Sequence, residues 1–173
     1  MLPRRKAARL RGYDYTQPGM YFVTVCTHSR RSVLGEVNGE EVRLTPVGLI
    51  VFEAWSSIPS HFSTVDIDTF VVMPNHIHGV LFLRDTVGAK HASPLQRISK
   101  GTVASSLSAV VQSFKSASSR LANRRYPDSD RPFWQRGFFE RIVRDDAELC
   151  RIRRYIEENP SRWAEDEYYR TNG

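Results

Sequence analysis

The stretch VDIDTFVVMPNHIHGVLFL, residues 65–83, contains two β-prone apolar runs separated by a Pro-Asn pair. A turn at this pair joins the runs into an antiparallel hairpin whose second strand opens with His76. Residues two apart on a strand point to the same face, so His76 and His78 project together, about 6–7 Å apart along the strand, while Ile77 faces the opposite layer. The hairpin therefore places two imidazoles side by side at the start of an otherwise apolar strand.

The chain on either side of this hairpin alternates between strand and helix patterns. An Asn-Gly pair between short apolar pieces predicts a loop or small hairpin over residues 29–46. The order β–α–β–β–α–β–α is that of a ferredoxin-like split βαβ sandwich, an α+β fold with an antiparallel sheet, helices on one face and an added C-terminal helix. We predict strands over 20–28, 65–73, 76–83 and 138–143, and helices from the Thr45 cap to a stop at Pro59, over 102–125 and over 145–159.

The length of 173 residues suits one packed domain. We assign residues 1–20 to a basic and aromatic N-terminal arm and residues 21–173 to a single domain. No window approaches the ~18 apolar residues of a membrane span, and no apolar segment of a signal peptide follows the basic start. We therefore expect a cytoplasmic protein with no membrane partner.

The net charge of +6 is unevenly distributed along the chain. Residues 1–11 carry five Lys or Arg and no acid, and residues 100–154 carry twelve basic and six acidic residues. Such an excess fits a surface that binds phosphates, and it equally fits an ordinary solvated surface. Charge alone leaves both interpretations open.

The histidine pair needs partners before it can be assigned as a metal site. Two imidazoles on one strand face can bind one ion, but histidines at a strand end are also common surface groups. Tyr155 and Asn159 are four residues apart and share one face of the helix predicted over 145–159. A tyrosine there can equally complete the core, and an Asn before Pro is a common helix end.

Six blocks of the sequence, in this order, resemble one family of proteins. The blocks are DYTQPGMYFVTVCTHSR (14–30), LTPVG (44–48), DTFVVMPNHIHGVLF (68–82), VVQSFKS (110–116), FWQRGFFERIVRD (133–145) and RRYIEENPSRW (153–163). They resemble the HUH single-strand nucleases of the Y1 transposase class. The resemblance is closest to the REP-associated tyrosine transposases, relatives of the IS200/IS605 transposases.

This resemblance implies a metal-dependent single-stranded DNA endonuclease and strand transferase, with residues 21–173 as the catalytic domain. In that family two histidines and a polar residue of the tyrosine helix hold a divalent metal, Mg²⁺ or Mn²⁺. Carried onto this chain, the ligands are His76, His78 and Asn159. Tyr155 is then the nucleophile, which forms a 5′-phosphotyrosine link to DNA.

The resemblance also implies that the partner is single-stranded DNA folded as hairpins of palindromic repeats, bound by a nucleoid-associated protein. A second hypothesis is a domesticated hairpin-binding protein with little or no cleavage, and monomer and homodimer both stay open. Each candidate DNA contact can also be a plain solvated side chain. The candidates for backbone contact and base stacking are Arg4, Arg5, Lys6, Arg9, Arg11, Tyr13, Tyr15, Lys115, Arg120, Arg124, Arg125, Trp134 and Arg136.

Overall fold

The computed structural model describes residues 17–84, 106–127 and 132–169. The division of the chain into an arm and a single domain therefore stays a prediction. Among these described residues, no helix combines the length and the apolar character needed to cross a membrane. The predicted arm contacts lie outside the described residues: Arg4, Arg5, Lys6, Arg9, Arg11, Tyr13 and Tyr15.

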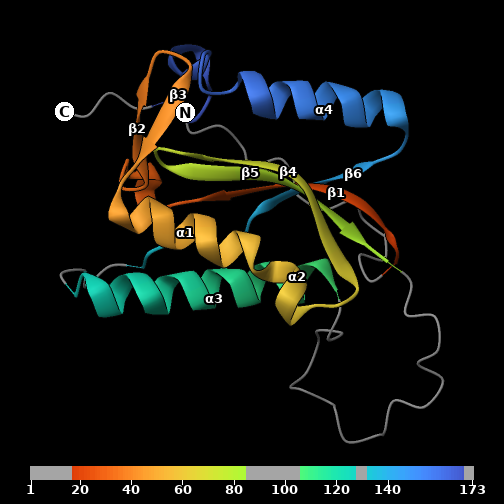
Figure 1. The fold of residues 1–173 in the computed structure, drawn as a ribbon, viewed down its shortest axis with the longest axis horizontal. Helices are drawn as coiled ribbons and strands as arrows, with labels where there is room; N and C mark the ends of the chain where they lie inside the picture. Colours follow the sequence, from red (N-terminus) through yellow and green to blue (C-terminus); the bar gives the residue numbers. More distant parts are fainter. Residues whose placement is uncertain (1–16, 85–105, 128–131, 170–173) are drawn as a thin grey trace, which may run out of the picture.

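A four-stranded antiparallel sheet forms the centre of the fold (Figure 1). Met73 pairs with His76, so a two-residue turn joins the central hairpin as predicted. The first strand lies between the third and the last strand of the sheet, which is the split βαβ arrangement, and the predicted α+β fold is confirmed. The strands are β1 (Gly19–Cys26), β4 (Val65–Met73), β5 (His76–Leu83) and β6 (Phe139–Val143), in the order β4-β5-β1-β6.

Helices cover both faces of the sheet (Figure 1). Two long helices, α1 (Pro46–Ser56) and α3 (Leu107–Arg125), lie together over one face. The helix that carries Tyr155, α4 (Asp146–Glu158), lies over the opposite face. The remaining elements are the one-turn helix α2 (Ile58–His61), the hairpin of β2 (Gly35–Asn38) and β3 (Glu41–Leu44), and the short 3-10 turns η1 (His28–Arg30) and η2 (Trp163–Glu165).

Local signals account for most of these boundaries. The Thr45 hydroxyl accepts a hydrogen bond from the backbone N–H of Gly48 at 3.0 Å, which confirms the predicted cap of α1. Gly39 has a φ of +65° and makes the tight turn between β2 and β3 that the Asn-Gly pair predicts. The predicted stop at Pro59 is wrong: α1 ends at Ser56 and Pro59 lies in the first turn of α2, where a missing N–H costs nothing.

The main core lies between the sheet and the layer of α1 and α3. The rings of Trp55 and Phe114 meet edge to face there, 4.9 Å apart. A Cβ at Gly79 would come 2.5 Å from the Trp55 ring, so β5 can pass under this ring only because position 79 has no side chain. The core residues that β1 and β5 supply are Tyr21, Val23, Val25, Ile77 and Leu81.

A smaller core fastens α4 to the other face of the sheet. The predicted apolar stripe of Leu149, Ile152 and Ile156 packs there against Phe22, Val80 and Val143. The carboxylate of Asp145 caps α4 by accepting a hydrogen bond from the N–H of Glu148 at 2.7 Å. The Glu148 carboxylate in turn accepts from the N–H of Arg144 at 2.9 Å. These contacts fix where the tyrosine helix starts and which side it turns to the sheet.

Candidate functional site

His76 and His78 lie on the face of the sheet that α4 covers. Both side chains are buried, and their ring centroids are 4.3 Å apart. Ile77 between them belongs to the core on the opposite face. The alternation predicted from the pleat is therefore present, and it brings two imidazoles together beneath the tyrosine helix.

Asn75, the turn residue before the pair, orients the first imidazole. Its amide nitrogen donates to the carbonyl oxygens of Arg30 (3.2 Å) and Tyr168 (2.8 Å), so its oxygen is the atom that faces Nδ1 of His76 at 2.9 Å. An amide oxygen only accepts, so Nδ1 of His76 carries the proton and Nε2 carries a lone pair. Nε2 is buried, and no described residue hydrogen-bonds to it. Sequence reasoning assigned Asn75 only to the turn.

The second imidazole lies between a hydroxyl and a phenol. The Thr24 hydroxyl is 2.8 Å from Nδ1 of His78, and the Tyr155 hydroxyl is 3.2 Å from Nε2. Burial lowers the pKa of His78 to about 3, and burial together with the neighbouring His78 and Arg30 charges holds the pKa of His76 well below its usual value. Both rings are therefore neutral at physiological pH, which is the form that binds metals.

Tyr155 and Asn159 reach the site from the end of α4. The ring of Tyr155 is 40% exposed and packs edge to face on Phe22, with centroids 6.1 Å apart. Burial, and then the carboxylates of Asp166 and Glu167, raise the pKa of the Tyr155 phenol to about 12. Asn159 is buried at the C-cap of the helix. The face of α4 predicted to carry Tyr155 and Asn159 is thus turned toward His76 and His78.

Asp166 is a further group at this site that sequence reasoning missed. The chain turns back after α4 through η2, and the Asp166 carboxylate accepts from the Asn159 amide at 2.8 Å and from the N–H of Tyr168 at 2.6 Å. Ligand atoms of His76, His78 and Asp166 all lie within 4.8 Å of one another, so these three groups could hold a metal ion. Nothing in the acidic segment WAEDEYY (163–169) marks this one carboxylate in advance.

The amide oxygen of Asn159 is also available to an ion. It is buried, and none of the described residues hydrogen-bonds to it, because the amide nitrogen is the atom that contacts Asp166. Two imidazole nitrogens, an amide oxygen and a carboxylate form a donor set typical of divalent cations. The structure therefore adds a negative charge to the ligands predicted from the sequence.

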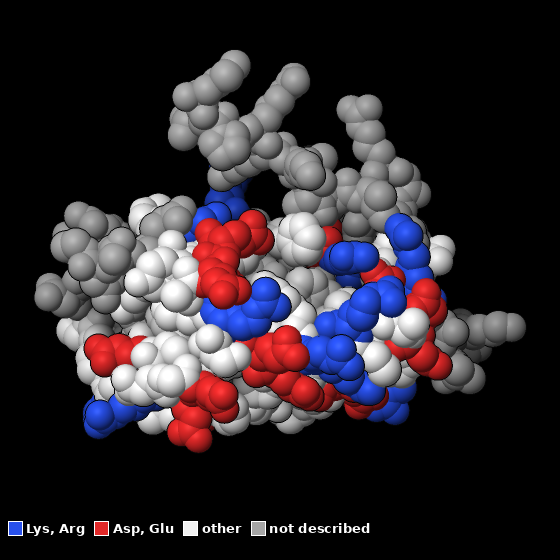
Figure 2. Space-filling model, turned by 90° about the horizontal axis from the view of Figure 1, so that it is seen from above, with Lys and Arg blue, Asp and Glu red and all other residues white. Residues whose placement is uncertain are grey.

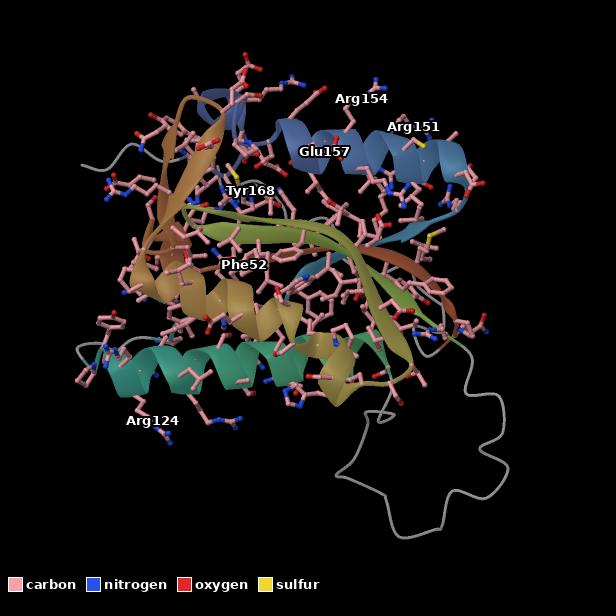
Figure 3. The ribbon with its side chains drawn as sticks, viewed as in Figure 1. Phe52, Arg124, Arg151, Arg154, Glu157 and Tyr168 are labelled. Carbon is pink, nitrogen blue, oxygen red and sulfur yellow. The ribbon has the colours of Figure 1, made fainter. Side chains whose placement is uncertain are left out.

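Tyr168 closes the site on the side of η1. Its ring centroid is 4.6 Å from that of His76, and the guanidinium carbon of Arg30 lies over the Tyr168 ring, 4.8 Å from the same centroid. Arg30 also donates to the carbonyl oxygen of Glu167 at 2.9 Å. Figure 3 shows Tyr168 between the sheet and the level of α4. The segment after η2 is thereby held against the histidine pair.

Part of the chain matches a known family of proteins. Residues 98–159 match the family model described as "Transposase IS200 like". This segment of the chain, which includes α3, β6 and α4, is similar to the IS200-like transposases. The predicted resemblance to IS200-like transposases is thus confirmed over these residues, which include Tyr155 and Asn159 but not the histidine pair.

Two further similarities cover nearly the whole chain. An uncharacterised protein of Haemophilus influenzae (strain ATCC 51907 / DSM 11121 / KW20 / Rd) is 34% identical over 170 residues, which is 95% of this chain and 93% of the relative. The solved structure of a REP-associated tyrosine transposase bound to a REP hairpin superposes with a TM-score of 0.62 at 21% identity, over 90% of this chain and 73% of that one. The chain therefore shares the fold of that transposase.

The structure does not support two of the predicted DNA contacts. Trp134 is buried and its indole N–H donates to the Ser118 hydroxyl at 3.0 Å, so neither face of the ring is offered to a base. Lys115 donates to the carbonyl oxygens of Gln135 (2.7 Å) and Gly137 (2.9 Å), which uses its ammonium group to hold the 134–137 loop. Both side chains have structural partners that a sequence pattern does not reveal.

The other described candidates are exposed, and three of them lie on the opposite side of the sheet from the tyrosine helix. Arg120, Arg124 and Arg125 lie on α3, which covers the face of the sheet opposite to α4 (Figures 1 and 3). Arg136 is exposed in the loop before β6. Figure 2 looks onto the α4 side and shows basic side chains gathered among acidic ones over this helix. Further arginines, which the sequence prediction did not include, lie on β6, on α4 or in the short segment between them. They are Arg141, Arg144, Arg151, Arg153 and Arg154.

Proposed function

We propose that the chain is a divalent-metal-dependent endonuclease and strand transferase for single-stranded DNA, with Tyr155 as its nucleophile. The observation that carries this proposal is the distance of 3.2 Å between the Tyr155 hydroxyl and Nε2 of His78, within a buried pair of neutral imidazoles. A tyrosine that only completed the core would not be expected to place its hydroxyl within hydrogen-bond distance of a buried imidazole.

The side chains of the site fit a divalent ion. His76 has a buried lone pair on Nε2 that no described residue uses, and Asn159 has a buried amide oxygen in the same condition. We propose His76, His78 and Asn159 as ligands, with Asp166 as a fourth group that ligates the ion or neutralises its charge. Bound there, Mg²⁺ or Mn²⁺ would act as a Lewis acid on an oxygen of the scissile phosphate.

The proposed reaction exchanges one phosphodiester for another. The Tyr155 oxygen forms a bond to phosphorus as the bond to the 3′ oxygen breaks, which leaves a 5′-phosphotyrosine and a free 3′ end. The phenol loses its proton and the departing 3′ oxygen gains one, so the step is balanced without a co-reactant. Because the ester is kept in the covalent link, a 3′ hydroxyl can reverse the reaction and rejoin strands without ATP.

Hairpin DNA with a single-stranded extension is the substrate that we propose. The related transposase with this fold was solved on a REP hairpin, and arginines surround the tyrosine helix here. The alternative, a hairpin-binding protein with little or no cleavage, would use the same surface but would not need the Tyr155 hydroxyl. The two functions therefore differ in one measurable product.

The test uses end-labelled hairpins from the palindromic repeats around the gene, with Mn²⁺ or Mg²⁺. The wild type is expected to form a covalent protein–DNA adduct that survives SDS, and Tyr155→Phe is expected to bind the DNA without forming it. Tyr126→Phe is the matched control, because Tyr126 is equally exposed, at 40%, but follows α3 on the other face of the sheet. Equal binding by all three proteins with no adduct from any of them would favour the binding-only alternative.

A further inference from the structure

A groove of about 410 Å³ opens beside Tyr155, between α4 and the edge of the sheet. Its lining includes His78 and Tyr155 together with residues of β1 and β6. Its volume is in the range of sites for small organic ligands. The lining residues that bear on its ligand are Phe22, Phe139, Arg141, Glu148, Arg151 and Glu167.

We propose that this groove binds one nucleobase of the single-stranded DNA, next to the scissile phosphate, and that Phe139 is the ring on which this base stacks. The inference rests on the proposed function for the identity of the ligand. It assigns to β6 a contact that the predicted stacking residue Trp134 cannot make, because Trp134 is buried.

Phe139 is an exposed aromatic ring with a fixed orientation. It is 43% exposed although it lies within a strand of the central sheet. Phe22 meets it edge to face, with centroids 6.3 Å apart, and Phe22 itself stacks on His78 at 5.3 Å. The ring is therefore supported from the sheet while part of its surface stays open to the groove, as a stacking platform requires.

Charge distinguishes this groove from the other opening at Tyr155. On the side of η2, a cavity of about 380 Å³ is lined by the acids Glu158, Glu165, Asp166 and Glu167, with Arg162 as its one basic lining residue among the described ones. The groove instead is lined by two arginines, Arg141 and Arg151, against two acids, Glu148 and Glu167, so it is the less acidic of the two openings. A DNA strand is a polyanion. It is therefore expected to reach Tyr155 along the groove and to avoid the acidic cavity near η2.

Of the two acids that line the groove, Glu148 and Glu167, the first is paired within the protein. The Glu148 carboxylate pairs with Arg141 at 2.5 Å and accepts from the N–H of Arg144 at 2.9 Å. The charges of Glu148 and Arg141 thus offset each other, and the groove offers an incoming nucleotide an aromatic ring with the Arg151 cation beside it. This combination binds unpaired nucleotides through stacking and backbone charge, with little preference among bases.

The test separates the base from the phosphates. A 12-nucleotide oligothymidylate and an abasic strand with the same number of phosphates serve as probes, and binding is measured by fluorescence anisotropy in EDTA. Phe139→Ala is expected to weaken binding of the oligothymidylate about tenfold, with no change for the abasic strand. Phe139→Tyr is expected to retain wild-type affinity, because it keeps the aromatic face.

Phe82→Ala is the matched control. Phe82 is 40% exposed and lies on the same face of the sheet, but on β5 away from the groove lining, and its loss is expected to change neither affinity. Wild-type affinity of Phe139→Ala for oligothymidylate would overturn the inference, and so would an equal loss for both probes. These measurements need no cleavage, so the absence of an adduct would refute the proposed reaction and leave the result on the groove standing.

Discussion

Nδ1 of His76 lies 2.9 Å from the amide oxygen of Asn75, and this contact leaves Nε2 of the same ring as a buried lone pair. The two amide hydrogens of Asn75 are committed to the carbonyl oxygens of Arg30 and Tyr168, so the side chain cannot flip without losing both bonds. The residue before the histidine pair thus selects the tautomer that a metal needs.

Replacement of Asn75 is therefore expected to act on metal affinity. Asn75→Ala should weaken Mn²⁺ binding by about 10–100-fold, as loss of such supporting hydrogen bonds does elsewhere. Isothermal titration calorimetry measures this directly. Asn38→Ala, at the exposed turn of the β2–β3 hairpin, is the control and should bind Mn²⁺ like the wild type. Unchanged affinity in a folded Asn75→Ala protein would contradict the assigned role.

Asp166 is expected to contribute through its negative charge. Asp166→Asn keeps the size of the side chain and removes the charge, and we expect at least tenfold weaker Mn²⁺ binding in the same titration. Glu165→Gln, one residue earlier and exposed, should leave the affinity unchanged. Equal effects of the two substitutions would mean that only the general acidity of this segment matters.

Gly79 is expected to tolerate no side chain. A Cβ there would come 2.5 Å from the buried Trp55 ring, so Gly79→Ala should lower the free energy of unfolding by about 1–3 kcal/mol. Gly19→Ala is the control in β1, because its nearest contact would be an ordinary 3.6 Å from Tyr21. Denaturant unfolding of both variants measures the difference, and similar stabilities would contradict the packing argument.

Glu148 is expected to stabilise the start of the tyrosine helix in a pH-dependent way. The N–H of Arg144, and then Arg141, hold the pKa of this carboxyl below its usual value. Its contribution is therefore present above the ordinary glutamate pKa of about 4.3 and is lost as the pH falls through the lower native pKa. At pH 7, Glu148→Gln should unfold with about 1–2 kcal/mol less free energy than the wild type.

The same comparison at low pH supplies the check. The difference between wild type and Glu148→Gln in denaturant unfolding should disappear at a pH below the native pKa of the carboxyl. Glu157→Gln, on an exposed position of the same helix, should differ little from the wild type at either pH. A constant difference across the pH range would show that the charge of Glu148 is not its source.

Local geometry explains why half of the candidate site is predictable from the sequence. His76 and His78 share a face because they are two apart in one strand, and Tyr155 and Asn159 because they are four apart in one helix. Which side of α4 turns to the sheet follows from its apolar stripe. These relations hold within single elements and need no knowledge of the tertiary structure.

The parts that sequence reasoning missed come from contacts between distant segments. Asp166 reaches the histidines only because the chain reverses at η2, and Asn75 orients His76 only because Arg30 and Tyr168 present carbonyl oxygens to it. Trp134 was predicted as an exposed aromatic, but it packs under α3 and bonds to Ser118. No spacing within the sequence encodes these approaches.

Peptide mapping of the trapped protein–DNA adduct tests the central proposal most directly. Wild-type protein is incubated with a repeat hairpin and Mn²⁺, the DNA is digested, and the modified peptide is identified by mass spectrometry. We expect a nucleotide linked through its 5′ phosphate to the Tyr155 hydroxyl, and no adduct from Tyr155→Phe. An adduct on another residue, or one that persists in Tyr155→Phe, would contradict the assignment of Tyr155 as the nucleophile.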